Sequence, residues 1–470
     1  MTNRHALQKG IGRLGFFSLA FGSMIGVGWI TGLQGMFEQA GPLGTAIAFI
    51  FGGLLMVVIG LCYAEAISIL PVTGGEVAYA YKAFGTQKAF FIGWALAFGY
   101  LSVSAFEAVS IGIVLSYLVK MDYWALYDVY ETTVYGSHVL LALVFTVFVA
   151  LINYCGAAIA TRFQIALTML LVLCTVGFVS AGFWDGEIQN VSPAFGSQDW
   201  KIALSGMLAV FVTVPFWYVG FDTIPQAAEE RVVDLPTKRL GQILIVAILG
   251  STLFYVLVFT SVGLITPWQD IIKKPLPTAV AFETAFKSPV LGRVVLLVGL
   301  IGLVTSWNGF FLAGTRVLFA LGRGHIIHST FGKTHQRFGT PSAAILVCGM
   351  VTFFGSLLGK PAILILLNVG SFCIALAFLG VALSLLKLRK FNGSTGSVAY
   401  RLMPYLAAAG SLFILGVMVF QLRKLEWYVL IAVILSGVVF WVAARKSREQ
   451  LSQQQRHQLI LDEDIQNSDE

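Results

Sequence analysis

Charged residues are scarce in this sequence. Of its 470 residues, 11% are charged and 57% are hydrophobic, whereas a soluble domain carries roughly 25% charged residues. The charges gather in short clusters between apolar runs that reach the roughly 20 residues needed for a membrane-spanning helix. The runs cover residues 14–37, 43–64, 89–119, 138–161, 163–184, 202–221, 240–269, 294–315, 338–359, 361–386, 402–422 and 427–444. This pattern excludes a soluble fold and predicts an all-α polytopic membrane protein with about 12 transmembrane helices.

Residues for metal, cofactor or nucleotide chemistry are also scarce. Five cysteines lie in the apolar runs at no metal-ligand spacing, and of the six histidines only His138 lies near a run, at its end. The cysteines are therefore typical of small buried side chains. The sequence contains no G-x-x-x-x-G-K-[ST] loop, the motif that cradles nucleotide phosphates. We therefore predict no metal, no cofactor, no ATP hydrolysis and no enzymatic activity. The first apolar run is too long and too glycine-rich for a cleavable signal peptide.

Positive charge is distributed unequally between the segments that join the runs. If the N-terminus is cytoplasmic, 21 of the 30 Lys and Arg residues fall on cytoplasmic segments, as the positive-inside rule requires. We therefore predict a multi-pass protein of the cytoplasmic membrane, embedded in the lipid bilayer with both termini inside. This distribution explains the net charge of +7, which gives no reason to expect nucleic acid as a partner.

Two segments outside the runs have a predicted structure of their own. Residues 447–470 are rich in glutamine and in mixed charge, which predicts a solvated cytoplasmic tail. Residues 268–288 are too polar to cross a membrane. Their apolar side chains Val280, Phe282 and Phe286 recur at helical spacing, which predicts a short helix on the outer surface.

Two spans contain helix-breaking residues in their interior. The first carries three glycines between Gly22 and Gly28, and the sixth carries Pro215, Gly220 and Pro225. A single residue of this kind is typical of close helix packing or of a kink. Breaks at matching positions of two halves instead indicate the binding site of an inverted-repeat transporter. The halves are predicted at 14–184 and 202–390, followed by two peripheral helices in 402–444.

The breaks also predict the kind of ligand. Backbone N–H and C=O groups that are unpaired at membrane depth persist only where a cavity, an ion or a ligand satisfies them. The N-terminus of a half-helix attracts a carboxylate, and freed carbonyl groups accept hydrogen bonds from an ammonium group. An amino acid zwitterion suits both.

Four stretches, in order along the chain, resemble the amino acid–polyamine–organocation transporter superfamily. Gly22-Ser-Met-Ile-Gly-Val-Gly28 is similar to the GSxxGxG signature of that superfamily. The other similar stretches are Tyr63-Ala-Glu65 with residues 71–79, Gly220-Phe-Asp222 with Glu229, Glu230 and Pro236, and residues 313–323 running on to Thr340-Pro341. The resemblance implies a five-plus-five inverted repeat with broken helices 1 and 6, two peripheral helices, and alternating-access transport of amino acids or amines.

The resemblance also implies roles for individual residues. The backbone of residues 22–28 would bind the substrate carboxylate, Phe216 would cover the substrate, and the carbonyls of residues 218–220 would receive its amino group. The predicted substrate-binding residues are Gly22, Ser23, Ile25, Gly26, Val27, Gly28, Phe216, Tyr218, Val219, Gly220 and Gly309. One position departs from the pattern. Many relatives carry a lysine in helix 5 that is linked to proton coupling or to helix 1, where this sequence has Leu171.

Glu107 is the one acidic residue inside the third apolar run. A charge at mid-membrane costs at least ~2.5–3.5 kcal/mol, and such residues usually face a bundle interior or a wet cavity. Three roles remain open for Glu107: a proton carrier that replaces the missing lysine, a counter-ion for an amine substrate, or a protonated structural residue. Glu107 and Asp222 are the candidates for coupling transport to an ion, which we expect to be H⁺.

The sequence as a whole predicts a secondary active transporter of amino acids that works by proton symport or by exchange. One alternative is an organic amine or polyamine permease, which needs a counter-ion in its cavity. Another is a transporter-like amino acid sensor, which the short tails without a signalling domain disfavour. A membrane-embedded enzyme would be favoured by metal-spaced His or Cys residues in the spans, and the sequence has none.

Overall fold

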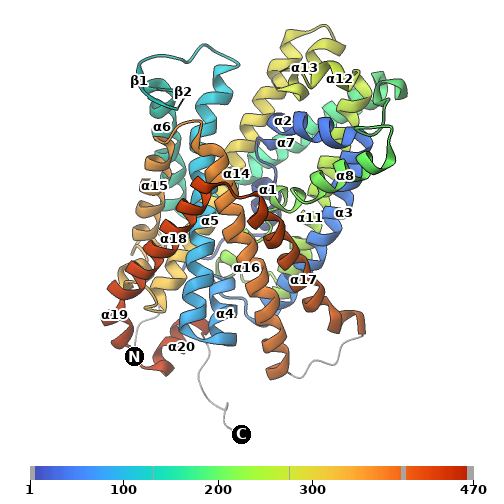
Figure 1. The fold of residues 1–470 in the computed structure, drawn as a ribbon. Coiled ribbons are helices and arrows are strands. Elements are labelled where there is room, and N and C mark those ends of the chain that lie inside the picture. The colour runs from blue at the N-terminus through green and yellow to red at the C-terminus, as the bar shows by residue number, and fades with distance from the viewer. Residues whose placement is uncertain (1–5, 131, 275, 393–397, 463–470) are drawn as a thin grey trace.

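The computed structural model describes residues 6–130, 132–274, 276–392 and 398–462, which form a bundle of long helices (Figure 1). The first part of the chain contains α1 (Arg13–Met24), α2 (Gly28–Thr31), α3 (Leu33–Ile69), α4 (Glu76–Phe84), α5 (Thr86–Ser116), β1 (Ala125–Val129), β2 (Thr132–Tyr135), α6 (Gly136–Tyr154), α7 (Ala157–Asp185) and η1 (Ile188–Val191). The second part contains α8 (Trp200–Phe211), α9 (Val214–Trp217), α10 (Thr223–Gln226), η2 (Ala228–Glu230), α11 (Thr237–Ile265), α12 (Trp268–Ile271), α13 (Pro277–Ala285), α14 (Pro289–Arg323), η3 (Ser329–Gly332), α15 (Ser342–Ser356), α16 (Ala362–Asn392), α17 (Val398–Gln421), α18 (Lys424–Ala443), α19 (Arg445–Glu449) and α20 (Gln453–Leu461).

The predicted all-α polytopic fold is confirmed. Within the described residues, 11 helical spans are long and apolar enough to cross a membrane when the pieces of a broken helix are counted together. The shorter apolar helix α15 has 15 residues, or about 22 Å. Large apolar side chains on the outside of the bundle are exposed, among them Leu173, Phe354 and Val439, and such a surface is stable against lipid rather than water.

The centre of the bundle is α14. Every residue from Gly302 to Arg323 is buried, because α14 is surrounded by α1, α5, α7 and α15. A helix that is covered on all sides provides a fixed surface, and α1, α2 and α10 from the two broken helices pack against it.

The two ends of the bundle carry different small elements (Figure 1). At one end lie α12, α13 and the antiparallel hairpin β1–β2, a pair of strands that the sequence did not predict. The helix expected within 268–288 is confirmed as α13. It is partly covered by the bundle, because Thr278 Oγ1 donates a hydrogen bond to Trp29 O over 2.9 Å. At the other end lie α4, α19 and α20.

The expectation of a solvated C-terminal tail is wrong for its first part. The short helix α20 packs on the end of α14, where Ile460 Cδ1 lies 2.5 Å from the position that a Cβ on Gly324 would take. Arg456 Nε donates to Gly324 O over 3.0 Å. Because Gly324 has no side chain, Ile460 fits against it and Arg456 reaches the Gly324 carbonyl oxygen. This part of the polar tail therefore packs against the bundle. Residues 463–470 lie outside the described residues.

Candidate binding site at two helix breaks

The first helix break separates α1 from α2. The helix leaves its regular path at Ile25, where ψ is 80°, and resumes at Gly28. Among the described residues, the backbone N–H groups of Gly26, Val27 and Gly28 have no acceptor. Val27 is buried, and Gly26 and Gly28 are half-buried; unpaired N–H groups are rare in the interior of a protein. This segment therefore presents three hydrogen-bond donors without partners.

The second break lies between α9 and α10. Gly220 has a φ of +129°, in the region that favours glycine over other residues. Its N–H group donates to Asp222 Oδ1 over 2.9 Å, and its carbonyl oxygen accepts from Thr223 Oγ1 over 2.7 Å. The carbonyl oxygens of Tyr218 and Val219 accept no hydrogen bond from the part of the chain that the structure describes. This break therefore presents two free acceptors.

The two breaks lie against each other and against α14. A Cβ on Gly220 would lie 2.7 Å from Ser23 Cβ, and a Cβ on Gly309 would lie 1.8 Å from Ser23 Oγ. Both positions require glycine, because any side chain would overlap Ser23. The Ser23 hydroxyl donates to Leu19 O over 2.5 Å, so it is already used inside α1.

Glu107 of α5 faces the first break, as its place in the third span suggested. A Cβ on Gly26 would lie 3.2 Å from Glu107 Oε1 and 3.4 Å from Ser306 Oγ. Ser306 lies beside the Glu107 carboxyl group, and Glu107 Oε2 has no partner among the described residues. The carboxyl group is 1% exposed. The structure thus brings the buried acid and the free N–H groups to one place.

Tyr255 of α11 links the two breaks and was not predicted. Its hydroxyl lies 2.7 Å from Met24 O and 3.3 Å from Trp217 O, which are the last carbonyl groups before each break. Trp217 was also missed, and its ring packs over Gly28, where a Cβ would lie 2.4 Å from it. Tyr255 is the single tyrosine in an otherwise apolar run, which is the signal that could have identified it.

The predicted aromatic residues of the second break point to different places. Phe216 lines a cavity of about 280 Å³ that also contacts Gln39, Asn368 and Ser371. The Tyr218 side chain instead packs between α3 and α11, where its hydroxyl lies 3.0 Å from Thr252 Oγ1. The structure therefore places Phe216 on a cavity wall and Tyr218 within the packed core, with the Tyr218 backbone at the break.

Neutral amides connect helices around the position of the missing lysine. Leu171 is buried beside Gly302, close to the carbonyl oxygens of Ile25 and Gly26. On the same helix, Gln164 Nε2 donates to Ser18 O over 3.1 Å and to Thr305 O over 3.0 Å. These bonds connect α7 to α1 and α14.

The amide network continues beyond Gln164. Asn308 Nδ2 donates to Gln164 Oε1 over 2.8 Å, and Asn153 Nδ2 donates to Asn308 Oδ1 over 2.9 Å. Gly22 faces this network, since a Cβ there would lie 2.5 Å from Gln164 Nε2. Sequence reasoning missed these residues, although amides inside apolar runs are a visible signal.

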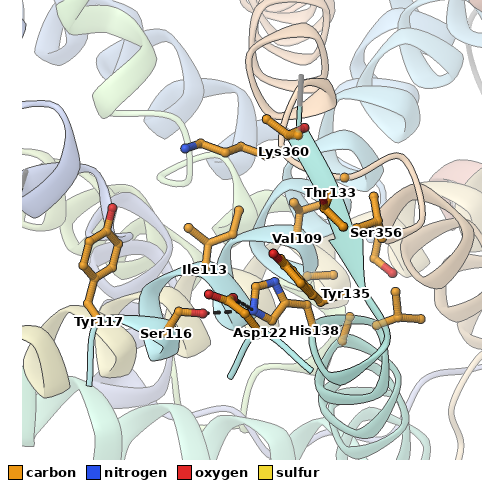
Figure 2. A pocket seen from close by; sticks show the side chains of 16 residues that line it. Val109, Ile113, Ser116, Tyr117, Asp122, Thr133, Tyr135, His138, Ser356 and Lys360 are labelled. Carbon is orange, nitrogen blue, oxygen red and sulfur yellow. Dashed lines mark hydrogen bonds and ion pairs between the residues drawn. The ribbon is translucent and has the colours of Figure 1, made fainter. Parts of the chain in front are cut away.

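A separate cavity of about 530 Å³ lies between α5, α6 and the β1–β2 hairpin. Figure 2 shows Ser116, Asp122 and His138 gathered on its wall, and Lys360 set apart from them. His138 Nε2 lies 2.9 Å from Ser116 Oγ and 3.3 Å from Asp122 Oδ1. Both neighbours contact the same ring nitrogen, whereas a Ser-His-Asp triad needs one on each nitrogen. This group of side chains does not have the geometry of a hydrolase site.

Two broken helices in contact inside a polytopic helical bundle are typical of one class of membrane protein, the secondary transporters. The chain also matches the amino acid permease family over residues 11–443. It belongs to that family.

Three relatives show how far the similarity extends. The branched-chain amino acid permease BcaP of Bacillus subtilis (strain 168) is 26% identical over 411 residues, which cover 83% of each chain. The methylthioribose transporter of the same organism is 25% identical over 393 residues, covering 78% of this chain and 80% of that protein. Asc-type amino acid transporter 1 of Mus musculus is 26% identical over 400 residues, covering 83% and 72%.

Proposed function

We propose that this protein is a secondary active transporter that moves amino acids across the cytoplasmic membrane by alternating access. The observation that carries the proposal is the set of three unpaired N–H groups at Gly26, Val27 and Gly28, beside a second break with free carbonyl groups. Unpaired groups at membrane depth need a partner. An amino acid supplies an acceptor for the first set and a donor for the second.

The proposed binding mode follows from this complementarity. The substrate carboxylate accepts hydrogen bonds from the N–H groups at residues 26–28, and the ammonium group donates to the carbonyl oxygens of Tyr218 and Val219. Glu107 is buried without a cation beside Gly26, so the protonated form is the less costly one there. In that form it donates a further hydrogen bond to the substrate. Phe216 lines the adjoining cavity, through which the substrate passes.

The relatives support this substrate class. Two of the three carry amino acid transport in their names. The third is named for methylthioribose, so membership of the family alone does not define the substrate, and the breaks in this chain must be tested directly.

The energy source that we propose is a proton gradient, used in symport or in exchange, with Glu107 and Asp222 as the coupling candidates. We also propose that both termini are cytoplasmic, because 21 of the 30 Lys and Arg residues then lie on the inner side. The two repeats at 14–184 and 202–390 and the peripheral helices in 402–444 remain predictions.

One observation favours a second candidate, an organic amine permease. A buried carboxyl group lies directly at the first break, and in its ionised form Glu107 would be a counter-ion for an amine without a carboxylate. That reading leaves the N–H groups of residues 26–28 without a ligand partner, so it ranks second.

Uptake of radiolabelled compounds into proteoliposomes separates the two candidates. Amino acids should be taken up, and their decarboxylated amines should neither be taken up nor compete. Uptake of the amines alone would support the amine permease, and uptake of neither class would refute both.

A further inference from the structure

Four acidic residues lie near α10, three of them buried and one, Glu229, half-buried. Two of the four are neutralised by arginine. Arg316 of α14 donates two hydrogen bonds of 2.8 Å to Glu230, and Arg323 donates two of 2.7 Å to Glu229. Such bidentate pairs satisfy both charges. These two acids therefore have a structural explanation.

The other two acids, Glu76 of α4 and Asp222, have no such partner. They are 1% and 0% exposed, and within the described part of the chain neither forms an ion pair. The polar side chains that face them are Tyr63 of α3, Tyr79 of α4, Tyr100 of α5 and Gln226 of α10. Beyond these lie the Glu229 and Glu230 pairs with arginine, whose charges cancel.

Hydrogen bonds join the two acids through neutral groups. Tyr100 donates its hydroxyl proton to Asp222 Oδ2 over 2.7 Å. Gln226 Nε2 donates to Glu76 Oε2 and lies 3.5 Å from the Tyr100 hydroxyl. The amide of Gln226 can present its NH₂ to an ionised carboxylate or its oxygen to a protonated one, so the network accommodates both states of Glu76.

Two carboxylates in one buried network without a cation cannot both ionise at low cost. We propose that Glu76 and Asp222 together bind one proton, and that this pair is the coupling site of the transporter. The inference rests on the proposed transport function, and it adds Glu76 to the coupling residues. Burial, together with the nearby charge of Asp222, raises the pKa of Glu76 above that of an ordinary carboxyl group. The pair therefore keeps its proton to a higher pH than an exposed carboxyl group does and loses it as the pH rises.

The pair is connected to the helix breaks. Asp222 Oδ1 accepts a hydrogen bond from the N–H group of Gly220, and Gly220 lies against Ser23 in the last turn of α1, next to the first break. A proton on Asp222 Oδ2 reverses the bond to Tyr100, whose hydroxyl group can also accept. Oδ1 still accepts from the N–H group of Gly220, but this bond is charge-assisted only while Asp222 is ionised. The protonation state of Asp222 thereby changes the strength of the bond to the second break.

The pair also lies across a contact between the two halves. A Cβ on Gly75, at the start of α4, would lie 2.6 Å from Pro225 Cβ in α10, so these elements touch. With one shared proton, the hydrogen bonds between Glu76, Gln226, Tyr100 and Asp222 hold α4 and α10 together. With both carboxylates ionised, the two negative charges repel each other. Release of the proton therefore weakens the contact between α4 and α10.

The first test uses proteoliposomes that contain a pH-sensitive dye. Substrate-dependent acidification of the lumen reports proton movement, and exchange of radiolabelled amino acid at equal pH on both sides reports substrate movement alone. We expect Glu76→Gln to keep exchange and to lose both acidification and accumulation driven by a pH gradient. Glu38→Gln, which changes an exposed acid on α3, is the matched control and should behave like the parent.

Two results would overturn the proposal. If Glu76→Gln still acidifies the vesicles when substrate is added, the proton travels elsewhere, and Glu107 becomes the candidate. If Glu76→Gln loses exchange as well, Glu76 serves substrate movement itself and the coupling role is refuted.

A second measurement needs no transport. Infrared difference spectra of the purified protein between mildly acidic and alkaline pH should show a protonated carboxyl band that Glu76→Gln lacks and Glu38→Gln keeps. An unchanged band in Glu76→Gln would refute the shared proton. If the parent transports neither amino acids nor amines but shows the Glu76-dependent band, the proposed function fails and the proton pair stands.

Discussion

The two helix breaks differ in how their backbone groups are satisfied. At the second break, the side chains of Asp222 and Thr223 bond the N–H and C=O groups of Gly220, so this break is partly closed by its own sequence. At the first break, no side chain among the described residues reaches the N–H groups of residues 26–28. In the function that we propose, the first break therefore binds the ligand, and the second break is bonded to a titratable side chain, Asp222.

The largest effect is expected from a side chain placed in the first break, because it would remove the difference between the two breaks. We predict that Gly26→Val abolishes uptake while the protein still reaches the membrane. The new Cβ alone would lie 3.2 Å from Glu107 Oε1 and 3.4 Å from Ser306 Oγ, and the two further methyl groups would cover the free N–H groups. Uptake and the amount of protein in the membrane should be measured together.

Gly416→Val is the matched control, because a Cβ on Gly416 meets no atom within 4 Å. It should transport like the parent. Normal kinetics in Gly26→Val would remove the first break from the binding site.

A smaller effect is expected at Glu107, and it separates the two candidate substrates. If Glu107 donates a hydrogen bond to an amino acid, Glu107→Gln keeps a donor and should retain binding. Glu107→Ala should lose about 1.5–3 kcal/mol, or about 10- to 150-fold in affinity. Equilibrium binding of a radiolabelled substrate measures both variants.

Other outcomes at Glu107 have defined meanings. Loss of binding in Glu107→Gln would identify an ionised counter-ion and favour an amine substrate. Normal binding in Glu107→Ala would leave Glu107 as a purely structural residue.

Phe216 tests the cavity wall rather than the backbone of the two breaks. An aromatic face next to a cationic group contributes about 0.5–2 kcal/mol, so Phe216→Ala should raise KM by about 2- to 30-fold. Phe216→Trp and Phe216→Tyr should be better tolerated. Equal kinetics for the alanine and tryptophan variants would show that Phe216 only fills space.

The smallest effect is expected from Tyr255, whose hydroxyl group contacts the last carbonyl group before each break. Tyr255→Phe removes the hydroxyl that bonds Met24 O, a contribution of about 0.5–1.5 kcal/mol, and should weaken substrate affinity by about 2- to 10-fold. Tyr428→Phe, which changes an exposed side chain, is the control. An affinity equal to that of the parent in Tyr255→Phe would show that the breaks hold their positions without this bond.

Local properties of the sequence predicted the local features of the fold. Span positions follow from apolar run length, and the breaks were placed because glycine and proline act on the backbone where they stand. The predicted segment 22–28 contains the observed break at residues 25–27. The position of Glu107 beside Gly26 was expected only in outline, since an acid at mid-membrane usually faces the interior of a bundle or a wet cavity.

Contacts between distant segments were not predicted. Glu76 and Asp222 meet through Gln226, which is 150 residues from Glu76 in the chain, and no local pattern encodes such a meeting. The tail was judged by its polar composition, yet Ile460 docks because a glycine at position 324 leaves space for it. Pairing of this kind depends on packing geometry that a single segment does not contain.

The central claim is that the unpaired N–H groups of the first break bind a substrate carboxylate. Competition against uptake of a radiolabelled amino acid, using the same compound with its carboxylate intact, esterified or removed, tests it most directly. The claim predicts that the unlabelled amino acid competes fully and that the ester and the decarboxylated amine compete at least about 10-fold more weakly, since a charge-assisted hydrogen bond contributes about 1.5–3 kcal/mol. Equal competition by all three compounds would contradict it.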